Sequence, residues 1–145
     1  MFFGTYTHSL DDGGRLTVPA KLRESAVQLQ QGPRLFLTCG AEPCIVAYTQ
    51  ARISEILEGM KDGSISREQA REFKRIFGGE GAMEAWDKHG RITLPEGLKD
   101  YAEIDKEVTI VGAVDCIEIW DVKAYAERLN TARAAYDDIA GKVIP

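Results

Sequence analysis

The stretch Asp11-Asp12-Gly13-Gly14-Arg15-Leu16-Thr17-Val18-Pro19 returns as Asp87-Lys88-His89-Gly90-Arg91-Ile92-Thr93-Leu94-Pro95, at a constant offset of 76 residues. A second match, at an offset of 72, pairs Gly40, Cys44, Ile45 and Tyr48 with Gly112, Cys116, Ile117 and Trp120. The first copy therefore holds four extra residues, which we place in the loop Gln28 to Pro33. A single copy of this repeat buries too little apolar surface to be stable alone. We therefore expect the two copies to pack together about a pseudo-twofold axis.

Each copy begins with a turn and a short strand. Polar and apolar residues alternate in Arg15 to Val18 and in Arg91 to Leu94. This alternation is typical of a strand with one buried face, so both arginines should point away from the core. The turns Asp11 to Gly14 and Asp87 to Gly90 suit a hairpin, because Gly and Asp accept positive φ. We expect the strands that lead into these turns to be Phe3 to Leu10 and Ala82 to Trp86.

Both copies then continue with a short helix and a second pair of strands. Pro19 and Pro95 fit the first turn of a helix, where a missing N–H costs nothing. The strand pairs that follow are Leu35 to Cys39 with Cys44 to Tyr48, and Val108 to Gly112 with Cys116 to Trp120.

Three longer helices separate and follow the copies, each with a start signal. Thr49 and Asp121 can cap helices, and Ser66 with Gln69 forms a capping box. An apolar stripe on the last helix should form core or helix-packing surface; it consists of Val122, Tyr125, Leu129, Ala132, Tyr136 and Ile139. The fold class is therefore α+β, with a first repeat at 1–48, a helical insert at 49–80, a second repeat at 81–120 and a C-terminal helix at 121–145.

The composition is that of an ordinary globular protein. The 145 residues include 18 Lys and Arg against 23 Asp and Glu, a net charge of −5. The entire negative excess lies in residues 81–120, so we place any anion-binding face near the N-terminus. No apolar run could span a bilayer and no export signal is visible, so we expect a cytoplasmic protein. The three cysteines lack zinc spacing and are interpreted as buried thiols, and we expect neither a metal nor a cofactor.

The paired turns are the candidate contacts with nucleic acid. A guanidinium on a rigid turn suits phosphate oxygens or a guanine edge, which points to Arg15 and Arg91. Further phosphate contacts could come from nearby cations, which are Lys21, Arg23, Lys88 and His89.

A purely structural interpretation of the same residues is also open. Asp11 with Arg15, and Asp87 with Arg91, could pair as exposed ion pairs worth about 0 to 1 kcal/mol. The turns need their glycines, Gly14 and Gly90, whatever the function.

The flanking segments, together with the two motifs, resemble one family. Three features are similar to the MraZ family of bacterial transcriptional regulators. They are the opening Phe3-Gly4-Thr5-Tyr6-Thr7-His8-Ser9-Leu10-Asp11, both D-x-x-G-R motifs with their trailing proline, and the closing Gly112 to Asp121 segment. The resemblance covers nearly the whole chain. It implies a DNA-binding protein without catalytic activity, with two AbrB-like swapped-hairpin halves and a ring-shaped homo-oligomer. It also implies a nucleoid-associated protein that binds direct repeats in the promoter of the cell-division and cell-wall gene cluster that family members head.

The family motif D-x-K-G-R falls on the turn residues Asp11, Gly14 and Arg15 and on Asp87, Gly90 and Arg91. Its lysine is replaced by Gly13 and His89, which removes a cation from each turn and should weaken phosphate binding. Several protomers of a ring that bind adjacent repeats can add their contributions. We favour Arg15 over Arg91 as the main contact, because the second copy carries the surplus of carboxylates.

Two other classes of function are compatible with parts of the sequence. His8, Ser9 and Asp11 suggest an enzyme, but His8 and Ser9 point to opposite faces of a strand and cannot form a nucleophile–base pair. The sequence contains no G-x-S-x-G, Walker or zinc motif, so we expect no enzymatic activity. The remaining alternative is an oligomeric scaffold of the same fold that does not bind DNA.

Overall fold

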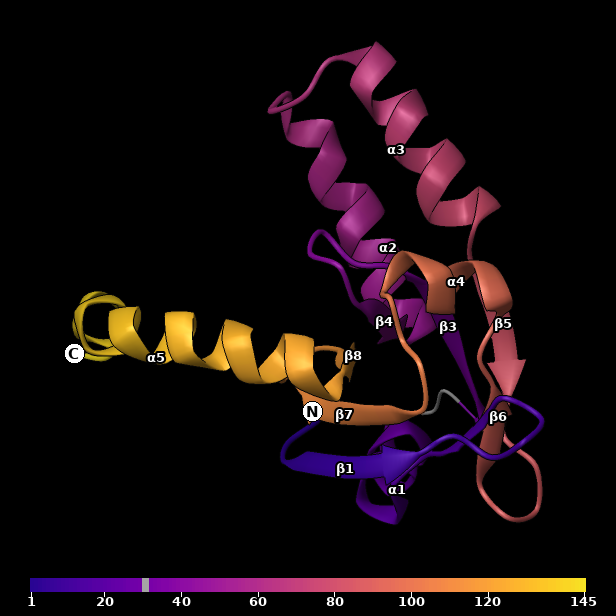
Figure 1. Cartoon of the computed structure of the whole chain (residues 1–145). Coiled ribbons are helices and arrows are strands. Elements are labelled where there is room, and N and C mark those ends of the chain that lie inside the picture. Colours follow the sequence, from indigo (N-terminus) through magenta and orange to yellow (C-terminus); the bar gives the residue numbers. More distant parts are fainter. Residues whose placement is uncertain (30–31) are drawn as a thin grey trace.

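The computed structural model, which describes residues 1–29 and 32–145, contains a six-stranded antiparallel sheet, a two-stranded ribbon and five α-helices (Figure 1). The first copy contains β1 (Thr5–Ser9), β2 (Arg15–Thr17), α1 (Ala20–Gln28), β3 (Arg34–Cys39) and β4 (Ile45–Tyr48). The second copy repeats this order with β5 (Ala82–Ala85), β6 (Arg91–Thr93), α4 (Glu96–Tyr101), β7 (Glu107–Gly112) and β8 (Ile117–Asp121). The α+β fold with two matching halves is confirmed.

The strand pairing is symmetric between the two copies. The sheet order β1-β7-β8-β4-β3-β5 is unchanged when each strand is exchanged for its repeat partner and the order is reversed. In the middle of the sheet, β4 pairs with β8 so that Val46 lies opposite Glu118, its match at the offset of 72. In the ribbon, β2 pairs with β6 so that Leu16 lies opposite Ile92, its match at the offset of 76. The expected pseudo-twofold axis therefore passes between the residues of both pairs.

The copies exchange their first strands, which corrects the local hairpins expected from the turns. β1 pairs with β7 of the second copy, and β5 pairs with β3 of the first. Each turn still reverses the chain, because the N–H of Asp11 donates to the carbonyl of Arg15 at 3.0 Å and that of Asp87 to Arg91 at 2.9 Å. Beyond each turn, the two strands that it joins separate and pair with different strands. This exchange agrees with the swapped-hairpin fold.

Two details of the short helices also differ from expectation. Pro19 and Pro95 are N-cap residues rather than first-turn residues, because ψ angles of 139° and 138° keep them outside the helical region. Helix α1 has 9 residues against 6 in α4, so part of the first copy's extra length lies in this helix. Residues 30 and 31 of the loop expected to hold that length, Gln28 to Pro33, lie outside the described residues.

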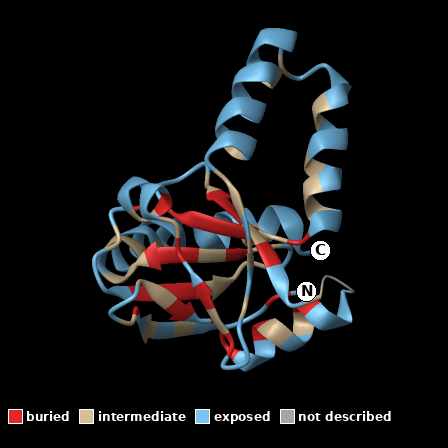
Figure 2. Cartoon of the chain, turned by 90° about the vertical axis from the view of Figure 1, so that its right-hand side faces the viewer, coloured by how far each residue is buried: buried red, intermediate tan, exposed pale blue. Residues whose placement is uncertain are grey.

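The three longer helices begin at the predicted caps. Helix α2 (Gln50–Gly59) begins after Thr49, and α3 (Arg67–Gly79) begins after Ser66 with both hydrogen bonds of the capping box. Helix α5 (Val122–Val143) begins after Asp121, which accepts hydrogen bonds from two backbone N–H groups. Figures 1 and 2 show the α2–α3 pair projecting from the body with mostly exposed residues. Among the described residues, no helix is long and apolar enough to cross a membrane.

The core lies between the sheet, the ribbon and the short helices. Its largest fully buried side chains include Phe2, Leu16, Leu22, Leu35, Leu37, Ile45, Ile92, Leu98, Ile110 and Ile119. Cys44 is also buried, but Cys39 and Cys116 are only half-buried, which corrects the expectation of three buried thiols. Burial raises the pKa of Cys39 to about 11 and the pKa values of Cys44 and Cys116 to about 12. All three thiols are therefore protonated at neutral pH.

Candidate nucleic-acid interface

Each turn is organised by one aspartate side chain. In the first turn, Oδ1 of Asp11 accepts hydrogen bonds from the backbone N–H of Gly13 at 3.0 Å and of Arg15 at 2.8 Å. Its Oδ2 accepts from Nε of Arg15 at 2.8 Å. The last residue of each turn, Gly14 or Gly90, has φ of 74° or 79°, a conformation that side chains rarely adopt. The D-x-x-G-R spacing therefore places carboxylate, glycine and arginine where one turn needs them.

The second turn repeats this geometry. Asp87 accepts from the backbone N–H of His89 at 2.8 Å and of Arg91 at 3.0 Å, and from Nε of Arg91 at 3.0 Å. The N–H of Arg91, followed by that of His89, lowers the pKa of Asp87 from 3.8 to about 2. The N–H of Arg15 likewise makes the largest contribution in lowering the pKa of Asp11. Both aspartates are therefore charged at neutral pH and hold their arginines.

The arginines meet on the outer face of the ribbon formed by β2 and β6. The central residue of each strand is buried, so its neighbours point outward. Arg15 lies opposite Thr93, and Thr17 lies opposite Arg91, so the pseudo-twofold axis relates the two arginines. Oδ2 of Asp11 also lies 3.9 Å from Nη1 of Arg91. This carboxylate therefore connects the arginines of both copies.

The arginine side chains are paired and also accessible. The side chain of Arg15 is 41% exposed and that of Arg91 is 30% exposed. The ion pairs considered as a purely structural alternative do exist, but they occupy Nε of each guanidinium. The Nη groups of Arg15 have no hydrogen-bond partner in the described chain. An arginine held at one edge and open at the other is preorganised for a phosphate or a guanine edge.

A cation from the opposite copy lies against each turn. Arg23 on α1 donates from Nε to the carbonyl of Val18 at 2.9 Å and lies against Gly90, where an added Cβ would come within 2.7 Å of its Cζ. Lys99 on α4 lies against Gly14, where an added Cβ would be 2.9 Å from its Nζ. Lys99 is the repeat partner of Arg23 at the offset of 76, the signal by which the sequence could have identified it. Both cations therefore pack against the glycine of a turn from the opposite copy.

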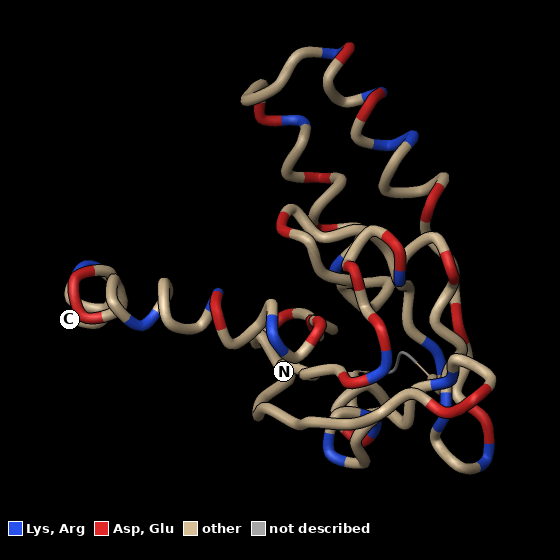
Figure 3. Tube along the Cα trace, viewed as in Figure 1, with Lys and Arg blue, Asp and Glu red and all other residues tan. Residues whose placement is uncertain are grey.

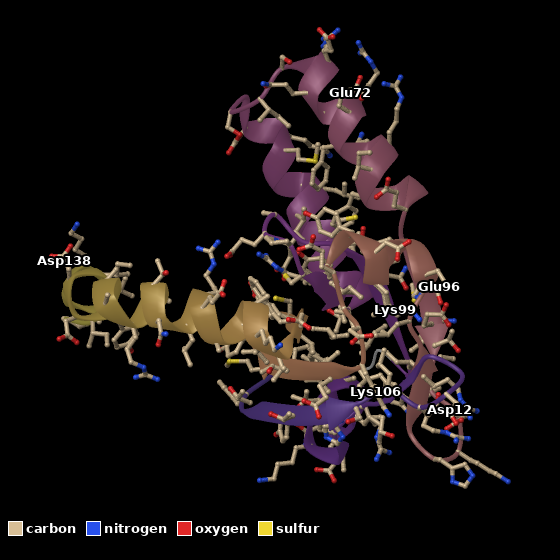
Figure 4. The ribbon with its side chains drawn as sticks, viewed as in Figure 1. Asp12, Glu72, Glu96, Lys99, Lys106 and Asp138 are labelled. Atoms are coloured by element: carbon tan, nitrogen blue, oxygen red, sulfur yellow. The ribbon has the colours of Figure 1, made fainter. Side chains whose placement is uncertain are left out.

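The surroundings of the two turns differ in charge. Lys88 and His89 are exposed in the second turn, and Lys21 is exposed on α1. The first turn has Asp12 in place of Lys88. A hollow of about 390 Å³ beside this turn is lined by side chains of both charges, which include Asp12, Glu96, Lys99 and Lys106 (Figure 4). Figure 3 shows acidic and basic positions interleaved around both turns. Charge totals over whole copies favour the first turn as the contact with nucleic acid, whereas the charges on the turns themselves favour the second.

The chain is similar along its whole length to proteins of one family. The family model described as "MraZ protein, putative antitoxin-like" matches residues 1–76 and again residues 76–139. A protein of Kocuria rhizophila named "Transcriptional regulator MraZ" is 39% identical over 145 residues, which cover 100% of this chain and 98% of that protein. Proteins with the same name are 37% identical in Clavibacter michiganensis subsp. michiganensis, over 100% of this chain and 98% of theirs, and 34% identical in Finegoldia magna, over 97% and 94%.

Proposed function

The chain belongs to the MraZ family of transcriptional regulators, and we propose that it acts by sequence-specific binding to double-stranded DNA. The DNA would be a set of direct repeats in the promoter of the cell-division and cell-wall gene cluster. The observation that carries this proposal is the pair of outward-facing arginines, Arg15 and Arg91, on the symmetric β2–β6 ribbon. A two-stranded antiparallel ribbon is one of the elements that the major groove of DNA admits.

In this mechanism the turns contact bases or phosphates and the neighbouring cations contact the backbone. Arg15 and Arg91 present guanidinium groups whose orientation is already fixed by the aspartates, so little side-chain entropy is lost on binding. Lys88 and His89 extend the second turn, and Lys21 is an exposed cation on α1. These groups would hold the register on the duplex through phosphate contacts.

A single chain carries a net charge of −5 and presents few cations to DNA at its turns. Each turn pairs one aspartate with one arginine, and the motif lysine is replaced by Gly13 or His89. We therefore propose that a ring-shaped homo-oligomer binds several repeats at once, which raises the effective concentration of each further contact. Repeats spaced by about one helical turn, about 10 bp, would present equivalent groups on one face of the duplex.

The second candidate is an oligomeric scaffold that does not bind DNA. One observation favours it: a carboxylate lies against each turn arginine, and the chain as a whole carries a charge of −5. Such a surface repels phosphates unless the guanidinium groups make direct contacts.

Titration of labelled promoter DNA separates the two candidates. The probe carries the direct repeats upstream of the chain's own gene, and the control has the same base composition with the repeats scrambled. DNA binding predicts tighter retardation of the repeat probe, with an affinity that falls steeply between about 50 and about 200 mM salt. Absence of retardation of either probe at low salt would favour the scaffold.

A further inference from the structure

Each end of the β2–β6 ribbon combines the turn of one copy with the start of a short helix from the other copy. The N–H of Val18, just before α1, donates to the carbonyl of Gly90 at 2.9 Å, and Arg23 of α1 packs against the same glycine. Gly14 receives the matching contacts at the other end, from a hydrogen bond of 3.2 Å and from the side chain of Lys99. We name these ends the α1 half (residues 20–24 with 87–91) and the α4 half (residues 96–100 with 11–15).

The two halves carry opposite charge. At the offset of 76 their ten residues match one to one, and seven of the ten pairs have the same charge when His is neutral. The α1 half has four basic and two acidic residues, whereas the α4 half has two basic and four acidic residues. A charge count by copies hides this difference, because each half takes its turn from one copy and its helix from the other. The difference arises at three pairs, which are Lys88 with Asp12, Ala20 with Glu96, and Lys21 with Gly97.

The cations of the two halves also differ in their partners. Lys21, Arg23 and Lys88 have no carboxylate partner within the described chain, and Arg23 uses only its Nε, on the carbonyl of Val18. In the α4 half, the side chain of Lys99 is only 13% exposed, and its Nζ lies 2.9 Å from Oε1 of Glu96 (Figure 4). The α1 half therefore presents cations that are free to bind an anion, whereas the α4 half neutralises its own.

We propose that this charge difference fixes the direction in which one chain lies on double-stranded DNA, with the α1 half making the phosphate contacts. The inference rests on the proposed function and adds a direction to it. Twofold axes relate the two strands of a duplex, so a ribbon with equal halves would bind in either of two opposite directions. Phosphates attract the α1 half and repel the α4 half, which favours one direction. A fixed direction suits sites repeated in one orientation, whereas equal halves suit an inverted repeat.

Two variants with the same charge change test which half contacts phosphate. Lys21→Ala with Lys88→Ala removes two exposed lysines of the α1 half, and Lys99→Ala with Lys106→Ala removes two lysines beside the first turn. We expect the first variant to bind the repeat probe about tenfold more weakly, with a salt dependence reduced by about two phosphate contacts. The second should stay within about twofold of the wild type. Circular dichroism shows whether both variants keep the fold.

The outcomes of this titration separate the inference from the proposed function. Retardation by the wild type with equal losses in both variants, or with the larger loss in the second, would overturn the inference alone. No retardation by the wild type would refute the proposed function together with the inference.

Photocrosslinking reads the direction itself. A photoreactive amino acid would replace His89 or its repeat match Gly13, which are both exposed and leave the charges of Lys88 and Asp12 in place. With the direction fixed, adducts from position 89 lie on one side of each repeat of the probe, and adducts from position 13 lie on the other side. Adducts from each position on both sides would contradict the proposal.

A variant with equal halves tests whether charge sets this direction. Asp12→Lys, Glu96→Ala and Gly97→Lys together give the α4 half the charges of the α1 half. A Cβ added at Gly97 meets no atom within 4 Å, so the helix has room for this change. Adducts from position 89 should then appear on both sides of each repeat. If they stay on one side, the charge difference does not set the direction and the proposal is wrong.

Discussion

A chain carrying both Arg15→Ala and Arg91→Ala should bind the promoter repeats about 30-fold more weakly, or weaker still. A lost arginine contact with DNA costs about 1 to 3 kcal/mol, and 1.4 kcal/mol corresponds to a factor of ten. Each single substitution should lie between the wild type and the double variant, because the pseudo-twofold axis places both arginines on one face. The turns should keep their shape, since Asp11 and Asp87 also accept backbone hydrogen bonds that alanine does not remove. The measurement is the affinity for the repeat probe at several salt concentrations.

A control with the same change in charge accompanies this variant. Arg71→Ala with Arg75→Ala removes two exposed arginines from α3, away from the ribbon. Its affinity for the repeat probe should equal that of the wild type. The assignment of the ribbon arginines fails if their removal leaves the affinity unchanged or if the α3 variant loses as much. Lysine at both ribbon positions keeps the charge but not the planar fork, so a loss of preference for the repeats would indicate contact with base edges.

The largest expected effect on stability comes from the buried pair under the arginines. Leu16→Ala or Ile92→Ala should each lower the free energy of unfolding by about 2 to 5 kcal/mol, because these side chains are 1% and 2% exposed and their removal leaves a cavity. The two lie opposite each other where the copies meet. We therefore expect the effects to be non-additive in the double variant. Urea unfolding followed by circular dichroism at fixed protein concentration measures all three.

Thr17→Ala provides the comparison on the same strand. This side chain is on the exposed face of β2, so its truncation should change the free energy of unfolding by no more than about 0.5 kcal/mol. If Leu16→Ala were as mild as Thr17→Ala, the ribbon would not join the two copies as described.

Local patterns in the sequence predicted most of the elements, because caps, turns and alternation act over a few residues. Ser66 with Gln69 formed the predicted capping box, and both turns closed as expected. The partner of each strand was not a local property. The alternation in β1 fits pairing with β2 or with β7 equally well, and the residues alone favoured the hairpin. The resemblance to a swapped-hairpin family implied the exchange that the structure contains.

The residues of the candidate site were also predicted only in part from the sequence. The motif spacing identified Asp11, Arg15 and their repeat partners, which form matching hydrogen-bonded turns. The offset of 76 could have identified Lys99 as the repeat partner of Arg23. Its contact with Gly14 joins opposite copies and follows only from their placement together. Charge totals along the sequence favoured Arg15, but they did not resolve the local difference between Asp12 and Lys88.

Site-specific photocrosslinking tests the contact between the ribbon and DNA most directly. A photoreactive amino acid would replace Thr17 or Thr93, which are exposed beside the two arginines, or Ala134 on the distant helix α5. The account predicts covalent adducts with the repeat probe from both ribbon positions and none from position 134. Adducts from position 134 alone, or none from the ribbon while the probe is bound, would show that DNA lies elsewhere on the protein.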